Sequence, residues 1–98
     1  MISVLGIPFD ANSSFLRGAA LAPARIRLMD SEGSANAFSE LGSEIKAGHS
    51  YHDLGDLKFE SADPAKAFDI IKSAIAKELA SNRKVLSLGG DHSVSYPI

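Results

Sequence analysis

The side chains best suited to chemistry stand together near the end of the sequence, directly after the apolar run Val85–Leu88. They are Gly89, Gly90, Asp91, His92 and Ser93. A glycine pair allows the backbone to turn sharply and to pass close to a ligand. In open α/β sheets, ligands bind at the carboxyl ends of the strands. A buried strand followed by an acid, an imidazole and a hydroxyl therefore predicts a binding corner.

Three chemistries are compatible with this corner. His92 could ligate a metal ion, and nearby carboxylates would suit a manganese-type site, but a catalytic metal needs about three or more protein ligands. Ser93 as a nucleophile with His92 as base is disfavoured, because adjacent turn residues rarely face each other and the G-x-S-x-G elbow is absent. A phosphate cradle at Gly89 and Gly90 lacks the G-x-G-x-x-G spacing and the P-loop lysine. From the residues alone, a glycine turn with a hydrogen-bonded Asp91–His92 pair is as plausible as the metal site.

Composition limits the classes of protein to which the chain can belong. Its 98 residues allow one small domain, and 45% hydrophobic with 22% charged residues is typical of a globular protein. The net charge is −2 and no basic run occurs, which argues against nucleic acid as a partner. The absence of cysteine excludes disulfides and thiolate chemistry. Without a signal peptide or an apolar run of roughly 20 residues, we expect no membrane association and a cytoplasmic location.

The elements that must position the corner alternate between strands and helices. The predicted strands are Ile2–Gly6, Tyr51–Asp56 and Val85–Leu88. One helix is predicted from Pro23 to about Ser31, and a second from Pro64 to about Ser81 with Asp63 as its cap. This order implies an α/β fold with parallel strands, right-handed crossovers and helices on the faces of the sheet.

Helical spacing also predicts which side chains are buried. In the second helix, the stripe expected to pack on the sheet is Phe68, Ile71, Ile75 and Leu79. The side chains expected mainly in solvent are Lys66, Asp69, Lys72, Lys77 and Glu78. Leu41 and Ile45 are four residues apart and predict a weak helical turn, and Ser93 is a candidate cap for a further helix.

Other polar residues have a functional and a structural interpretation. The loop Pro8–Gly18 follows the first strand, so it either walls a pocket or is only a connector. Arg25 and Arg27 could reach an anionic group, although solvated arginines or a local salt bridge are favoured. Asp56 is a candidate metal ligand, but a turn-capping carboxylate is favoured.

Three matches, in chain order, resemble the ureohydrolases of the arginase and agmatinase family. Gly89–Ser93 with Tyr96 and Pro97 looks like the first metal-binding motif of that family. The stretches Gly6–Asp10, Arg17–Gly18, Ala22–Pro23 and Ile26–Arg27 resemble the N-terminal signature of agmatinase-like members. Asp53–Asp56 is similar to the family's D-x-G-D turn.

The resemblance implies a three-layer α/β/α domain with a larger parallel sheet, of which residues 1–98 supply the first three strands as an incomplete N-terminal part. It implies hydrolysis of a guanidino group by hydroxide held and activated by two bridged manganese ions. His92 would ligate one Mn²⁺. The residues implied to form the turn or to support that ligand are Gly89, Gly90, Asp91 and Ser93. Asp10 and Arg17 would lie at the active-site rim or at a subunit contact.

The sequence departs from the family pattern in its remaining ligands. The D-A-H-x-D and D-x-D-x-x-D-P motifs are absent, and the candidates His49, His52, Asp53 and Asp56 lack that spacing. We therefore expect the N-terminal segment of a manganese-dependent ureohydrolase for an agmatine-like substrate, inactive by itself. The alternatives are a non-catalytic ureohydrolase-like binding or assembly module and, less favoured, an unrelated nucleotide-binding α/β domain. Because three parallel strands leave exposed edges, a homo-oligomer is also expected.

Overall fold

The computed structural model describes residues 1–11, 17–32, 36–61 and 63–98. The elements, in chain order, are β1 (Ile2–Ile7), the 3₁₀ helix η1 (Ala19–Leu21), α1 (Ala22–Ser31), β2 (Tyr51–Asp56), α2 (Pro64–Ala80), β3 (Lys84–Gly89) and the 3₁₀ helix η2 (His92–Ser95). The predicted strands and helices are confirmed, with bounds that differ by a residue or two. Among the described residues, no helix is both long and apolar enough to cross a bilayer.

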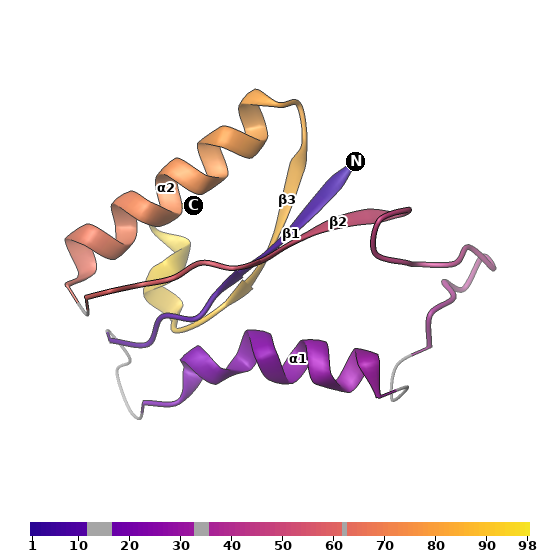
Figure 1. Ribbon diagram of the computed structural model, residues 1–98, viewed down its shortest axis with the longest axis horizontal. Coiled ribbons are helices and arrows are strands. Elements are labelled where there is room, and N and C mark those ends of the chain that lie inside the picture. The colour runs from indigo at the N-terminus through magenta and orange to yellow at the C-terminus, as the bar shows by residue number, and fades with distance from the viewer. Residues whose placement is uncertain (12–16, 33–35, 62) are drawn as a thin grey trace.

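The three strands form one parallel sheet in the order β2-β1-β3. β1 and β3 stay in register from Ile2 opposite Lys84 to Ile7 opposite Gly89. α1 and α2 lie on opposite faces of this sheet, so the predicted three-layer α/β/α arrangement is confirmed (Figure 1). Both crossovers return the chain to the same end of the sheet, so the carboxyl ends of all three strands share one edge.

The face of the sheet covered by α2 holds the apolar core. Its buried members are Leu5, Ile7, Phe9, Ala67, Ile71, Ile75 and Val94. The helix begins as predicted, because the Asp63 carboxylate accepts a hydrogen bond from the Ala65 N–H at 3.1 Å and Pro64 follows the cap.

The last turn of α2 differs from the prediction. Leu79 is 58% exposed, whereas Glu78, predicted to lie in solvent, is 5% exposed. The buried Ser3 hydroxyl donates to Glu78 Oε1 at 2.7 Å, and Arg83 Nη1 lies 3.3 Å from the same oxygen. The Ser3 hydrogen bond lowers the pKa of Glu78 against the opposing effect of burial, with further help from Arg83. A charged side chain can replace an apolar one here because both partners satisfy it.

Leu41 and Ile45 do not lie on a helical turn, so that prediction is wrong. Phe38 pairs with Glu44 in an isolated antiparallel bridge, and the Ile45 N–H donates to the Ala37 carbonyl at 2.6 Å. Gly42 adopts a φ of 85°, which closes the turn between them. Leu41 stands at this turn 95% exposed, so its spacing from Ile45 does not reflect a buried helical face.

The face covered by α1 is open. A groove of about 820 Å³ separates α1 from the sheet and is lined mainly by apolar side chains. Its apolar members include Ile2, Val4, Ile26, Met29, Leu86 and Leu88. Ile26, Met29 and Leu86 remain about half exposed, so this side of the sheet is only partly covered.

Candidate functional site

The predicted binding corner lies at the carboxyl edge, where the chain leaving β3 crosses the chain leaving β1. The Asp91 N–H donates to the Phe9 carbonyl at 2.9 Å and ties the two segments together. Gly90 has a φ of 30°, and a Cβ on it would lie 2.5 Å from the carbonyl oxygens of Ile7 and Phe9. Only glycine fits this crossing without moving backbone, which accounts for the second glycine of the pair.

Asp91 holds the turn that follows. Asp91 is 6% exposed, and its carboxylate accepts hydrogen bonds from the Ser93 N–H at 2.9 Å and from the Ser93 hydroxyl. The prediction that Ser93 caps a helix is wrong, because the extended backbone of Asp91 places its own carboxylate over the first turn of η2. Val94, buried in the core, anchors the other side of η2.

His92 is the first residue of η2 and is exposed between the buried residues Asp91 and Val94. The turn thus presents an imidazole to solvent at the carboxyl edge while its neighbours are fixed. His52 pairs with Ser3 near the amino ends of the strands, so the structure does not bring it to His92. In the part of the chain that the structure describes, no three His, Cys, Asp or Glu side chains are grouped to hold a metal ion.

The predicted rim residues Asp10 and Arg17 form hydrogen bonds between the two ends of the loop after β1. The Asp10 carboxylate accepts from the Gly18 N–H at 2.7 Å and from the Ala20 N–H at 3.3 Å, and Arg17 donates to the backbone carbonyl of Asp10. These backbone donors, Gly18 first, lower the pKa of Asp10. Residues 12–16 of this loop lie outside the described residues. The pair stands at the carboxyl end of β1, and its role at a rim or subunit contact stays a prediction.

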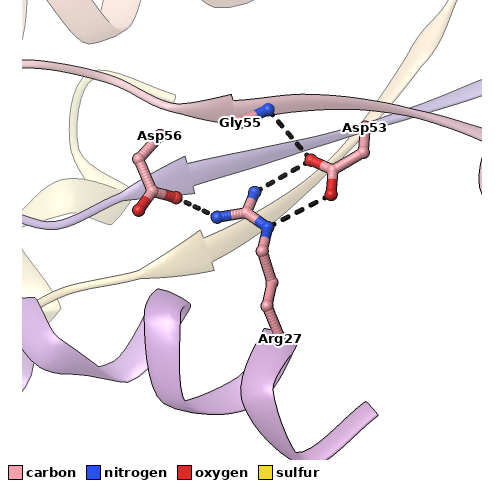
Figure 2. Close-up of polar contacts among 4 residues, drawn as sticks. All are labelled: Arg27, Asp53, Gly55 and Asp56. Atoms are coloured by element: carbon pink, nitrogen blue, oxygen red, sulfur yellow. Dashed lines mark hydrogen bonds and ion pairs between the residues drawn. The ribbon is translucent and has the colours of Figure 1, made fainter. Parts of the chain in front are cut away.

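An ion cluster that the sequence did not predict as a unit lies between α1 and β2 (Figure 2). Arg27 binds Asp53 through two nitrogens, with Nε 3.2 Å from Oδ2 and Nη2 3.0 Å from Oδ1, and binds Asp56 through Nη1. The salt bridge favoured for Arg27 is present, but its partners are 26 and 29 residues away rather than local. The turn-capping role favoured for Asp56 is wrong, because Asp53 accepts the Gly55 N–H at 2.9 Å while Asp56 pairs with the arginine.

A bulge in β2 makes this cluster possible. Val4 pairs with Asp53 and Gly6 with Asp56, so β2 advances one residue more than β1 over this interval. Side chains three residues apart on a regular strand point to opposite faces, but the extra residue, with Gly55 at a φ of 77°, turns both carboxylates toward α1. The D-x-G-D spacing was the signal in the sequence for the two carboxylates. No local pattern indicates their arginine partner, because Arg27 is 26 residues away from Asp53 in the chain.

Both carboxylates of the cluster are paired with the Arg27 guanidinium. Partial burial alone would raise the pKa of Asp53, but the Gly55 N–H and the Arg27 guanidinium outweigh it and lower that pKa. Asp56 is satisfied by the same guanidinium, so the geometry favours a structural role for it over metal ligation.

A three-layer parallel α/β protein with an exposed histidine at the carboxyl edge of its sheet is the class that fold and site define. Within that class the chain belongs to the arginase family, whose model matches residues 1–98. The predicted ureohydrolase resemblance is therefore confirmed at the level of the family, whose members are ureohydrolases acting on linear amidines.

Individual relatives agree with this assignment. Mitochondrial arginase 1 from Arabidopsis thaliana is 37% identical over 102 residues, covering 98% of this chain and 30% of that protein. Agmatinase from Bacillus cereus is 33% identical, covering 99% of this chain and 33% of that protein. The chain thus spans about a third of the length of these curated relatives.

Solved structures show the same fold. Arginase from Medicago truncatula superposes with a TM-score of 0.85 at 31% identity, over 98% of this chain and 32% of that one. A hypothetical agmatinase from Burkholderia thailandensis gives a TM-score of 0.83 at 28% identity, over 98% of this chain and 30% of that one.

Proposed function

We propose that residues 1–98 form the N-terminal part of a manganese-dependent ureohydrolase domain that hydrolyses a guanidino compound to urea and an amine. The observation that carries this proposal is the exposed His92 on a rigid turn at the carboxyl edge, in a chain of the arginase family. The carboxyl edge of a parallel sheet is where α/β enzymes bind their ligands.

The residues present fit part of a metal site. Imidazole is the commonest protein ligand for metals, and His92 can supply one such ligand while Asp91 and Val94 hold its turn in place. Manganese in this family would lower the pKa of a bound water and so supply a nucleophile near neutral pH. The described residues do not complete the ligand set, so we assign no catalytic step to this chain and expect it to be inactive alone.

The open face of the sheet supports a partial domain. Among the described residues, no further strand pairs with the outer edges of β2 and β3, which leaves backbone groups there open to pairing. The groove under α1 leaves apolar surface exposed. A complete domain, or association with a second copy, would cover both. A homo-oligomer and a cytoplasmic location both stay predictions. We propose an agmatine-like substrate because the N-terminal motif resembles that of agmatinase-like members, and the relatives include both arginases and agmatinases.

Manganese binding at His92 can be tested by proton NMR of the imidazoles during titration with Mn²⁺, which broadens nearby resonances. The chain offers its own references, because it holds three histidines, of which His49 and His52 are also exposed. We expect His92 to broaden at the lowest Mn²⁺ concentration and His92→Asn to remove that response. Earlier or equal broadening at the other two imidazoles would refute His92 as the preferred ligand.

Catalytic competence can be tested by urea release from arginine, agmatine and guanidinobutyrate with Mn²⁺. We expect no release above the metal-free blank, because one ligand cannot hold two divalent ions. Release that depends on Mn²⁺ and disappears in His92→Asn would contradict the expected inactivity of the chain.

The non-catalytic alternative has one observation in its favour, the missing ligand cluster among the described residues. The intact mass of the protein in its source separates the two proposals. A mass of about three times 10.3 kDa, in line with the share of relatives that the chain spans, supports the enzyme. A mass of 10.3 kDa supports a binding or assembly module.

A further inference from the structure

We propose that Arg27 is a positioning residue, which acts through Asp56 and the end of β1 to hold the turn that carries His92. Any effect of Arg27 on catalysis rests on the proposed function, whereas its contacts and the hydrogen exchange that they control are properties of the chain itself. The residue lies on α1, on the face of the sheet opposite the apolar core, and makes no described contact with His92 itself.

The first step runs from α1 to the end of β2. The Arg27 side chain rises from α1 and its fork spans the two carboxylates that the β2 bulge turns toward it (Figure 2). Two parallel hydrogen bonds to Asp53 fix the orientation of the guanidinium plane, and the remaining nitrogen then holds Asp56. A planar fork can do this, whereas the point charge of lysine cannot bind both carboxylates in the same geometry.

The second step runs from Asp56 to β1. Asp56 lies so close to Gly6 that a Cβ on this glycine would overlap the carboxylate and would lie 3.1 Å from Arg27 Nη1. The Gly6 carbonyl accepts from the Leu57 N–H at 2.9 Å, directly after Asp56. The arginine therefore fixes the last β1–β2 hydrogen bond through the residue next to it.

The third step runs from β1 to the turn with His92. β1 ends at Ile7, whose carbonyl accepts from the Phe9 N–H at 2.8 Å. The Phe9 carbonyl in turn accepts the Asp91 N–H at 2.9 Å, beside the crossing that requires Gly90. Arg27 and the His92 turn thus hold the same short segment, residues 6–9, from its two sides.

Native-state hydrogen exchange of the full 98-residue chain tests this coupling, because it reports local opening separately from global unfolding. The informative amides are Leu57, bound to Gly6, and Asp91, bound to Phe9, with Arg83, bound to Glu78 at the opposite edge, as reference. In Arg27→Lys we expect exchange at Leu57 and Asp91 to accelerate about fivefold or more, a factor typical of one lost interaction. Exchange at the Arg83 amide should stay unchanged.

Two matched variants complete the experiment. Arg25→Lys changes an exposed arginine of the same helix and should alter none of the three rates. Asp56→Asn keeps the shape of the side chain while removing its charge, and should accelerate the same two amides as Arg27→Lys. Equal acceleration of all three amides would reduce Arg27 to a general stabiliser, and no acceleration at Asp91 would refute the coupling.

The outcome is independent of the proposed function, because the exchange is measured without metal or substrate. If exchange at Asp91 does not accelerate in Arg27→Lys, the coupling is refuted, and the Mn²⁺ titration of His92 still tests the proposed function separately. Conversely, a failed Mn²⁺ titration with accelerated exchange at Asp91 would keep Arg27 as the residue that positions this turn.

Discussion

The two faces of the sheet are held by different forces. On the α2 face, Leu5 and Ile7 of the central strand pack against Ile71 and Ile75, all of them buried. On the α1 face, the helix is joined to β2 by the cluster of Arg27 with its two aspartates, and the apolar groove stays open beside it. One sheet can therefore carry a closed apolar interface on one side and a polar contact at a single point on the other.

The helices account for the difference. α2 has 17 residues and buries four of them, Ala67, Ile71, Ile75 and Glu78, at spacings of three or four. α1 has 10 residues, and among its described residues Pro23 is the one that is buried. Because an exposed ion pair contributes much less than a buried aliphatic side chain, we expect the α2 face to dominate the free energy of unfolding.

Truncation of one isoleucine on each face gives the largest expected effect. Ile71→Ala removes a fully buried side chain and should lower the free energy of unfolding by about 2 to 5 kcal/mol. Ile26→Ala, half exposed in the groove, should lower it by about 1 kcal/mol or less. Urea denaturation followed by circular dichroism measures both. Equal losses would mean that the groove is closed in solution, and the comparison between the faces would fail.

A methyl group at Gly6 probes the contact on the α1 face. Gly6→Ala would drive a Cβ into the Asp56 carboxylate, so we expect a loss of about 1 to 3 kcal/mol. Arg27→Met, which removes the ion cluster, should cost about 1 kcal/mol.

The double variant Gly6→Ala/Arg27→Met sharpens this result. Since both changes break the same contact, the double variant should lose less than the sum of the single losses, by 0.5 kcal/mol or more as is usual for coupled neighbours (about 0.5 to 3). Ser3→Ala is the control on the α2 face, because it breaks the hydrogen bond to Glu78 near the amino ends of the strands, away from the His92 turn. Its loss should add to that of Arg27→Met, and a shortfall would show that the faces are coupled.

The elements of the fold were predictable because each has a local signal. Apolar runs marked β1 and β3, a short segment ending in a glycine turn marked β2, and Asp63 with Pro64 marked the start of α2. The position of the His92 turn followed from the glycine pair after β3. These features depend on residues close together in the chain, so periodicity and turn chemistry were sufficient to find them.

The errors occurred where contacts that residue spacing does not encode decide the structure, and the largest of these contacts join residues distant in the chain. Glu78 is buried because the Ser3 hydroxyl, 75 residues away in the chain, donates to it. The spacing of residues within the helix cannot predict this partner. The turn at Leu41 depends on backbone pairing of Phe38 with Glu44, which overrides the four-residue spacing of the apolar side chains. The two aspartates of the ion cluster share a face only because of the β2 bulge. Local pattern therefore locates the candidate site, while long-range polar contacts decide what holds it.

We expect acid to lower the free energy of unfolding through a carboxylate on each face of the sheet, and a variant on each face measures its own contribution. The pKa of Asp53 is lowered from 3.8 in the folded state, so its contribution is present at pH values above 3.8 and is lost as the pH falls through the still lower folded value. The stability difference between the native chain and Arg27→Met, about 1 kcal/mol near neutral pH, should therefore shrink toward about pH 2.

On the α2 face, protonation of Glu78 should likewise lower the free energy of unfolding in acid. Its pKa is lowered from 4.5, first by the Ser3 hydroxyl, so its contribution is present above pH 4.5 and is lost below, as the folded value is crossed. Ser3→Ala should therefore flatten the acid limb of the stability curve while leaving the Arg27→Met difference intact. Thermal unfolding from about pH 7 to about pH 2 measures both slopes. If Ser3→Ala also removes the Arg27→Met difference, the carboxylates titrate as one unit and the two faces are not independent.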